Sequence, residues 1–126
     1  MKVEVSTAID ELKRQFPAAA FVVREDGAGG ALVLIDPVSL GHKYRPDSTW
    51  MGFHIPPQYP YADVYPVFIG VVSRANGAAF VAPVTLGHHF EGRPAIQISR
   101  RNGAAHTGLQ KATSKVLKVL HYLDTL

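Results

Sequence analysis

The sequence predicts a two-layer α+β domain, in which an antiparallel sheet packs against a helix from each end of the chain. Three observations predict this class: an amphipathic helical pattern near each terminus, four short apolar segments of strand-like composition between them, and no helical pattern separating those strands. Strands that follow one another directly favour an antiparallel meander over a parallel sheet with crossover helices. The expected order is an N-terminal helix, a four-stranded antiparallel meander, a long loop and a C-terminal helix.

Length and composition place all of this in a single domain, residues 1–126. The chain is 47% hydrophobic and 18% charged, which is typical of a globular domain of about 100–200 residues. Its longest apolar runs, ALVLI and PVFIGVV, are too short to cross a bilayer or to form a signal-peptide core. The net charge of +3 is modest and the basic residues are scattered. We therefore expect a soluble cytoplasmic protein that has neither nucleic acid nor a membrane as its partner.

The first helix is predicted over residues 6–16. Its apolar residues recur at helical spacing: Ala8, Ile9, Leu12 and Phe16. Thr7 and Asp10 stand in a capping-box-like arrangement, and Pro17 ends the pattern. This is the pattern of an amphipathic helix with one buried face.

The four strands are predicted from short runs rich in β-branched and apolar residues. Residues 19–25 and 30–38 form a hairpin, because the turn DGAGG between them contains glycines that tolerate positive φ angles. Residues 48–55 alternate partially, and residues 67–72 form the fourth strand.

Two connections have distinctive compositions. Residues 55–66, IPPQYPYADVYP, are interpreted either as a rigid crossover between strands or as an aromatic ligand-binding patch, and both interpretations stay open. Residues 73–94 are predicted to be a long loop that carries glycines and histidines. Loops of this length are usually functional or disordered.

The last helix is predicted over residues 107–126. An apolar stripe of Leu109, Val116, Leu117, Leu120 and Leu123 is expected to face the sheet, and the opposite face carries Lys111, Lys115 and Lys118. We interpret the three lysines as a solvated face, with a basic docking surface as the alternative.

The candidate chemistry of the side chains is limited. The chain has six histidines and no cysteine, which excludes disulfides and thiolate metal sites. His88 and His89 are adjacent, but neighbouring side chains diverge along an extended chain and no metal-binding spacing accompanies them, so we expect no metal site. The sequence has no Gly-x-Ser-x-Gly elbow around Ser99 or Ser114, and DGAGG joins two strands instead of opening a helix.

The middle of the chain carries an ordered set of motifs: a strand, Ile-Pro-x-x-Tyr-Pro with further prolines, another strand, and a histidine-bearing loop. This order resembles the core of the ubiquitin-conjugating enzymes. In that family the active-site loop carries a histidine and leads to Gly-x-x-Cys followed by an aliphatic residue. Here His88, His89 and Gly92 precede Ala95 and Ile96, so the resemblance puts the catalytic cysteine of the family at Ala95.

The resemblance covers about residues 5–124 and is closer to the compact bacterial members of the family. Those members have a Cys-aliphatic-Gln-aliphatic-Ser-Arg-Arg run, which residues 95–101 resemble with alanine in place of cysteine. The eukaryotic His-Pro-Asn tripeptide is absent, and His88, His89 or Asn102 are the candidates to support the oxyanion in its place. Two C-terminal helices of longer members are also missing. Bacterial anti-phage conjugation is the context that the resemblance suggests.

The resemblance implies an enzyme that carries the C-terminus of a ubiquitin-like protein as a thioester on a cysteine at position 95. The thiolate takes this C-terminus from a ubiquitin-activating-type enzyme and yields it to an amine, without a cofactor. Arg93, Arg100 and Arg101 are expected to lower the pKa of such a thiol and to attract an acidic partner. Lys13 and Arg14, on the first helix, are the expected contacts for the activating enzyme.

Alanine is neither a nucleophile nor a leaving group, so the chain as written is inactive in this reaction. Three interpretations remain open. Ala95 is an engineered replacement in a ubiquitin-like conjugating transferase, or the chain is a naturally inactive module of the same fold that binds a ubiquitin-like protein or a conjugation partner non-covalently. The third is an α+β domain that uses its histidine loop to bind zinc or a small molecule.

Overall fold

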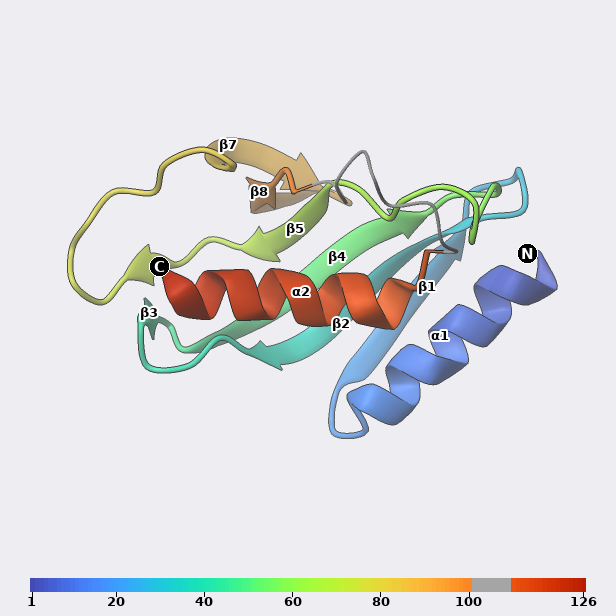
Figure 1. Ribbon diagram of the computed structural model, residues 1–126, viewed down its shortest axis with the longest axis horizontal. Helices are drawn as coiled ribbons and strands as arrows, with labels where there is room; N and C mark the ends of the chain where they lie inside the picture. Colours follow the sequence, from blue (N-terminus) through green and yellow to red (C-terminus); the bar gives the residue numbers. More distant parts are fainter. Residues whose placement is uncertain (101–109) are drawn as a thin grey trace.

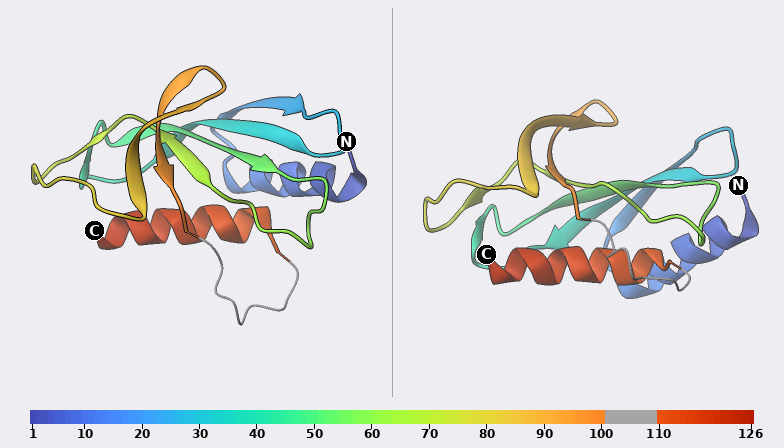
Figure 2. Two further views of the ribbon diagram at one scale, coloured as in Figure 1. Left: turned by 90° about the horizontal axis from the view of Figure 1, so that it is seen from above. Right: turned by 45° about the horizontal axis from the view of Figure 1, so that its top comes forward.

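A computed structural model describes residues 1–100 and 110–126. Within these residues a six-stranded antiparallel sheet packs against two helices, α1 (Val3–Gln15) and α2 (Ala112–Thr125) (Figure 1). The strands of the sheet, in the order β1-β2-β4-β5-β8-β7, are Ala20–Glu25, Ala31–Ser39, Ser48–Ile55, Val67–Gly70, Arg93–Ile98 and Val84–Phe90. Strands β3 (Tyr44–Arg45) and β6 (Ser73–Arg74) form a separate pair. Both helices lie on one face of the main sheet, and the hairpin of β7 and β8 rises on the other (Figure 2).

The predicted α+β class, both helices and the antiparallel meander are confirmed, with β1, β2, β4 and β5 in the expected places. The count of four strands and the long loop over residues 73–94 are wrong, because residues 84–98 form a hairpin that adds two strands to the sheet. The edge strand β7 is mostly exposed, and a bulge with Gly87 at φ 81° interrupts its register. It therefore lacks the alternating apolar pattern from which strands are predicted.

Helix α1 begins earlier than its pattern predicts. Its N-cap is Lys2, so Thr7 lies inside the helix and the predicted capping box is wrong. The amide of Ser6 donates to the Lys2 carbonyl, which closes the first turn. The buried face consists of Val5, Ala8, Ile9 and Leu12. The predicted stripe is therefore right apart from its last member, because Phe16 follows the helix and is only partly buried.

Helix α2 is rotated relative to its predicted stripe. Lys115 is only 4% exposed, whereas Leu117 is 42% exposed, so the predicted solvated position of Lys115 and the predicted buried position of Leu117 are both wrong. Lys115 tolerates burial because its Nζ donates to the Asp63 carboxylate at 3.0 Å and to the Arg100 carbonyl oxygen. Leu109 of the predicted stripe lies outside the described residues.

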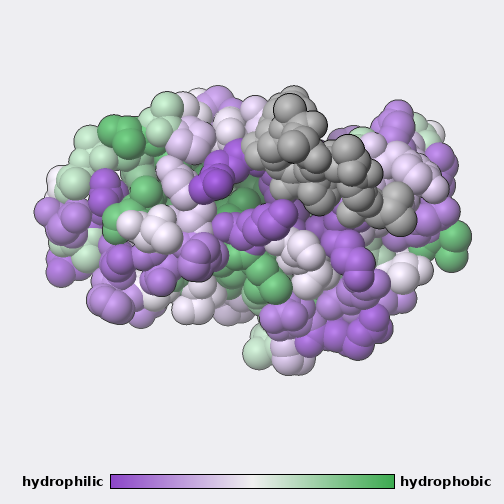
Figure 3. Space-filling model, in the orientation of Figure 1, coloured by the Kyte–Doolittle hydropathy of each residue, from purple (hydrophilic) through white to green (hydrophobic). Residues whose placement is uncertain are grey.

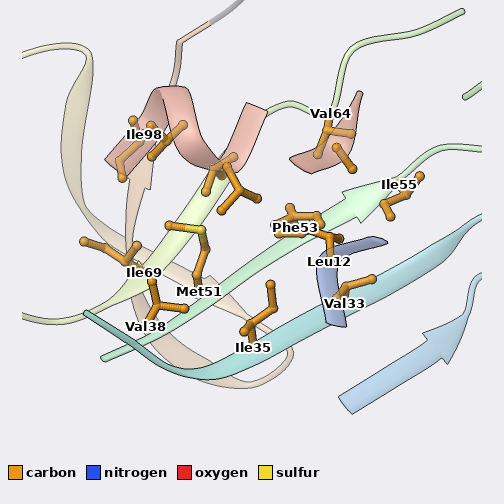
Figure 4. Close-up of a cluster of buried hydrophobic side chains, with 14 of the residues drawn as sticks. Leu12, Val33, Ile35, Val38, Met51, Phe53, Ile55, Val64, Ile69 and Ile98 are labelled. Carbon is orange, nitrogen blue, oxygen red and sulfur yellow. The ribbon is translucent and has the colours of Figure 1, made fainter. Parts of the chain in front are cut away.

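The main core fills the space between the sheet and the two helices (Figure 4). Aliphatic side chains dominate it, with Phe53 and Met51 at its centre. Its members come mainly from both helices and from strands β2, β4, β5, β7 and β8, and they include Leu12, Val33, Ile35, Val38, Ile55, Ile69 and Ile98. Fully burying one such side chain contributes about 1.5–3 kcal/mol, so this layer holds the helices on the sheet.

The segment of residues 55–66 connects β4 to β5 and also fixes the start of α2. The Ala112 amide donates to the Tyr59 hydroxyl oxygen at 3.1 Å, and the Gln110 amide donates to the Pro60 carbonyl at 2.8 Å. Burial raises the pKa of Tyr59. These contacts fit the interpretation of a rigid crossover, although Tyr61 projects into solvent.

Across the described residues, neither helix has the length and apolar character needed to cross a membrane.

Candidate functional site

The segment that the sequence predicts to be the active-site loop is a tight β-hairpin. Strands β7 and β8 are joined by Glu91 and Gly92, whose φ angles of 50° and 78° are both positive, as a two-residue hairpin turn of type I′ requires. Strand β8 pairs on its other side with β5, where Ala95 faces Gly70. Position 95 therefore lies in the interior of the sheet, between two paired strands.

Ala95 is 1% exposed. It belongs to a second cluster of buried residues, on the face of the sheet away from the helices, which we call the hairpin cluster: Leu34, Trp50, Phe90 and Ala95, with Leu32 and Phe68 packed against it. The next residue, Ile96, points to the opposite face and joins the main core. The surroundings of position 95 are thus apolar and closed to solvent.

Two glycines leave room for the rings of the hairpin cluster. A Cβ atom at Gly52 would lie 2.5 Å from Cε2 of Phe90, so this ring lies directly against the main chain of β4. A Cβ at Gly70 would overlap Thr49 Oγ1 and lie 2.9 Å from Trp50 Nε1. The Phe90 ring stacks on Trp50 and Phe68, with centroid distances of 6.0 and 5.2 Å. Because the Phe90 and Trp50 rings lie directly against the main chain at these glycines, the hairpin packs closely over the sheet.

The tip of the hairpin is tied to the far edge of the sheet. The Arg24 guanidinium on β1 donates twice to the Glu91 carboxylate, at 2.7 and 3.3 Å, and these hydrogen bonds raise the pKa of Arg24. Arg93 lies 5.9 Å from the centre of the Trp50 ring. Between the tip and the edge strand is a groove of about 230 Å³, lined mainly by Val22, Arg24, Leu32, Leu34, Phe90, Glu91 and Arg93.

The two neighbouring histidines diverge, as expected for an extended chain. His88 is half-buried, pairs with Ala95 across the strands and lies 2.9 Å from Thr85 Oγ1 through its Nε2. His89 pairs with Pro94 and is exposed. Among residues 1–100 and 110–126, no group of three or more metal-ligating side chains is close enough to hold a metal ion.

The predicted arginine cluster is divided between two sides of the molecule. Arg93 belongs to the hairpin, whereas the Arg100 guanidinium lies 4.4 Å from the centre of the Tyr122 ring on α2. Arg101 and Asn102 lie outside the described residues. The structure therefore brings His88 next to Ala95 and, among the described residues, separates Arg93 from Arg100.

Lys13 and Arg14 lie in the last turn of α1, on the helix face of the sheet (Figure 2). The Lys13 ammonium is 6.0 Å from the centre of the Phe21 ring, and both basic residues are exposed. They are accessible to a partner, but they lie on the opposite side of the sheet from the hairpin.

Sequence reasoning missed a hydrogen bond between Asp26 and His54 and a buried ion pair between Lys115 and Asp63. The Asp26 carboxylate lies 2.7 Å from His54 Nε2 and accepts the amides of Ala28 and Gly30, and the His54 contact is the main reason why the pKa of Asp26 is lowered. An aspartate that opens a glycine-rich turn is a signal for these amide contacts, but the pairing with His54 depends on strand register. The pair of Lys115 and Asp63 has no local signal, because 52 residues separate the two side chains.

No family model, no curated protein and no solved structure matches this chain. Its class is therefore defined by its own architecture: an α+β domain with two helices on one face of an antiparallel sheet and a closed, apolar hairpin cluster on the other.

Proposed function

We propose that this protein is a non-covalent binding module of the ubiquitin-conjugating type, which recognises a ubiquitin-like protein or a conjugation partner without forming a thioester. One observation carries this proposal: position 95 holds an alanine that is 1% exposed within an apolar cluster, in a chain that has no cysteine. Transthioesterification needs a thiolate that a partner protein can reach.

The order of elements supports the comparison with conjugating enzymes. Helix α1, the antiparallel strands β1, β2, β4 and β5, the proline-rich crossover, the histidine-bearing hairpin and α2 follow one another as the resemblance implies. The hairpin departs from an open active-site loop in being paired on both sides of β8. This order of elements, combined with a closed site, is what we expect of a binding module.

The outer surface around the hairpin offers the contacts for such a partner. Leu86 on β7 and Val22 on β1 are apolar and strongly exposed. Val22 also lines the groove at the hairpin tip, together with Arg93 and the ion pair of Arg24 and Glu91. A small apolar area with charged residues at its rim is typical of a transient protein interface.

The first test asks whether position 95 is accessible. An Ala95→Cys variant is labelled with a thiol-specific reagent, with Leu86→Cys, on the exposed part of β7, as the matched control. Because position 95 is buried, we expect its thiol to react at least ~100-fold more slowly than the control, and the two rates to converge in denaturant. Equal rates in the native protein would favour the conjugating enzyme.

The same variant can be incubated with ubiquitin, a ubiquitin-activating enzyme and ATP. A closed site predicts no adduct that is released by a thiol reductant, although the activating enzyme itself becomes charged. Formation of such an adduct on the Ala95→Cys variant would replace the binding proposal with the enzymatic one.

The second test measures binding directly. The ¹⁵N-labelled protein is titrated with ubiquitin, and the proposal predicts amide shifts that cluster on β7, β8 and β1. An Arg93→Glu change should weaken these shifts, whereas Arg45→Glu, on the separate strand β3, should not. If millimolar ubiquitin leaves the hairpin amides unchanged, the ubiquitin-binding form of the proposal is wrong.

A further inference from the structure

Strand β1 is a regular, apolar edge of the sheet. Among the described residues it pairs with β2 alone, and its six residues face six successive residues of β2 without a bulge. Its sequence, AFVVRE, contains no proline and no charge in its first four residues. Edge strands are usually protected by a bulge, a proline or a charge, because their free main-chain groups otherwise pair with another chain. The other edge, β7, has such a bulge at Gly87, whereas β1 has no such protection.

The side chains of β1 alternate between the two faces of the sheet. Val22 is 60% exposed and lines the groove at the hairpin tip, next to Leu34 on β2. Phe21 and Val23 point to the helix side and pack against the main core. Residues opposite each other on paired strands share a face. A residue opposite Val22 on an added strand would therefore lie beside apolar surface on the hairpin side.

Helix α1 runs alongside β1 on the helix side of the sheet (Figure 1, Figure 2). The flank of α1 that faces the strand is identified by Lys13, whose ammonium lies 6.0 Å from the centre of the Phe21 ring. Glu11 is two residues away, about 200° around the helix axis, and Glu4 lies two turns before it on that opposite flank. Hydrophilic residues dominate the surface over α1 in the space-filling view (Figure 3). The helix thus presents a basic flank to β1.

Lys13 is the charge that this edge offers to a partner. It is exposed, and within the described part of the chain no carboxylate pairs with its ammonium. Arg24, on the hairpin side, already binds the Glu91 carboxylate. The β1 edge is therefore basic on the helix side and apolar at Val22 on the hairpin side.

We propose that β1 binds an extended segment of the partner protein as an additional antiparallel strand, with an acidic side chain beside Lys13 and an apolar one beside Val22. Neighbouring side chains of a strand point to opposite faces, so a segment in which acidic and apolar residues alternate presents each kind to its matching face. In this mode of recognition main-chain hydrogen bonds give affinity and the side chains give specificity. Because Val22 belongs to the surface proposed above, the inference rests on the proposed function and specifies how its partner is held.

A second copy of the chain is a poorer match for the same edge. Two β1 strands that pair antiparallel about a two-fold axis at Val22 would place both α1 helices on the same side of the joined sheet (Figure 1). Lys13 lies over Phe21, one residue from this axis, so the two ammonium groups would come close together. The repulsion between like charges opposes such a pairing.

The first test uses the full chain and a fluorescein-labelled peptide of about eight residues, in which Glu and Val alternate. The control peptide has Gln in place of each Glu. We expect the anisotropy of the Glu peptide to rise on titration with the protein, and its affinity to fall as salt is added. The Gln peptide keeps the valines without the charges, so it should bind at least ~5-fold more weakly.

Amide hydrogen exchange tests the main-chain pairing itself. In an antiparallel edge strand, amides that point outward alternate with amides that face the neighbouring strand. With saturating Glu peptide, we expect the outward amides of β1 to exchange at least ~10-fold more slowly, and the amides of the other edge strand, β7, to exchange at an unchanged rate.

Val22 and Leu86 provide a matched pair of variants, because they lie on the two edge strands and are 60% and 62% exposed. Val22→Glu should weaken binding of the Glu peptide at least ~10-fold and Leu86→Glu by less than ~2-fold, although both change the net charge equally. Circular dichroism checks that each variant is folded.

Lys13 and Arg14 provide a second matched pair. Both are exposed basic residues of the last turn of α1, but Arg14 is turned about 100° further from the buried Leu12 and points away from the sheet. Lys13→Glu should weaken binding of the Glu peptide at least ~5-fold, and Arg14→Glu by less than ~2-fold.

Three results would each overturn the proposal: no anisotropy change with the Glu peptide, no protection of the outward amides of β1, or equal effects within either pair of variants. A dimer detected by sedimentation and dissolved by Val22→Glu would assign the edge to a second copy. Ubiquitin shifts on β7 and β8 without binding of the Glu peptide would keep the proposed function and reject the pairing with β1. Binding of the Glu peptide without ubiquitin shifts would do the reverse.

Discussion

The two faces of the sheet are stabilised in different ways. The helix face buries a large, mostly aliphatic core contributed mainly by both helices and by strands β2, β4, β5, β7 and β8. The hairpin cluster has four buried members among the described residues, of which Trp50 and Phe90 are aromatic rings that lie against glycines. Both faces are close-packed, but a ring that lies against glycine main chain leaves no room for an added methyl group. The helix face therefore contributes most to the stability of the fold, and the hairpin face adds contacts that hold the outer part of the hairpin over the sheet.

Neighbouring residues on β4 allow the two faces to be compared directly, because Phe53 points into the main core and Gly52 lies beneath Phe90. The largest effect is expected from Phe53→Ala. This side chain is fully buried, so its removal leaves a cavity and should lower the free energy of unfolding by about 3–5 kcal/mol. Urea unfolding followed by circular dichroism measures the loss. A loss below about 1 kcal/mol would mean that the core is not packed as described.

The matching change on the hairpin face is Gly52→Ala, for which we expect a smaller loss of about 1–3 kcal/mol. The added methyl group meets the Phe90 ring, so the hairpin must shift while the helix face stays intact. Trp50 is the only tryptophan of the chain and stacks on Phe90, so its fluorescence reports this shift. A second change, Phe90→Leu, should restore part of the stability. Failure of that rescue would show that Phe90 is not the group in contact.

The helix face was also the easier one to predict from the sequence. Helical spacing identified both helices, and short runs rich in β-branched and apolar residues identified β1, β2, β4 and β5. Strand β7 was missed because it is an exposed edge strand with a bulge. The burial of Lys115 was missed because it depends on Asp63, which comes from a distant crossover.

The candidate site, too, was predictable from the sequence only in part. The resemblance to ubiquitin-conjugating enzymes brought His88 and Ala95 into one hypothesis, and the two residues do pair across the hairpin. Local sequence could not show that Ala95 is enclosed by Trp50 and its neighbours, because this enclosure is created by strand pairing and by the glycines of β4 and β5. Nor could it show that Arg93 and Arg100 lie on different sides of the molecule.

A weaker attachment is tested by Glu91→Gln, which removes the charge that holds the hairpin tip to Arg24. The pair is exposed, and exposed ion pairs contribute little to global stability, so we expect no measurable change in urea unfolding. Local opening should be affected, with amide hydrogen exchange of the hairpin a few-fold faster. Arg24→Gln should give the same result, and the two changes should not add. An unchanged exchange rate in both variants would mean that packing of Phe90 alone holds the tip.

The smallest effect on stability is expected in the turn between β1 and β2, where a change should be detectable only at acid pH. The hydrogen bond with His54, together with the amides of Ala28 and Gly30, lowers the pKa of the Asp26 carboxyl. Its folded pKa is therefore below the unfolded value of about 3.9, so ionised Asp26 stabilises the fold above that pH, and this contribution is lost as pH falls through the folded pKa.

The stability difference between the wild type and Asp26→Asn should be constant above about pH 5 and shrink below about pH 4. Urea unfolding over this pH series measures it, and His54→Ala should reduce the pH-dependent part, because the main cause of the lowered pKa is then missing. A stability difference that stays constant down to the lowest pH would mean that the ionised Asp26 carboxylate does not stabilise the fold.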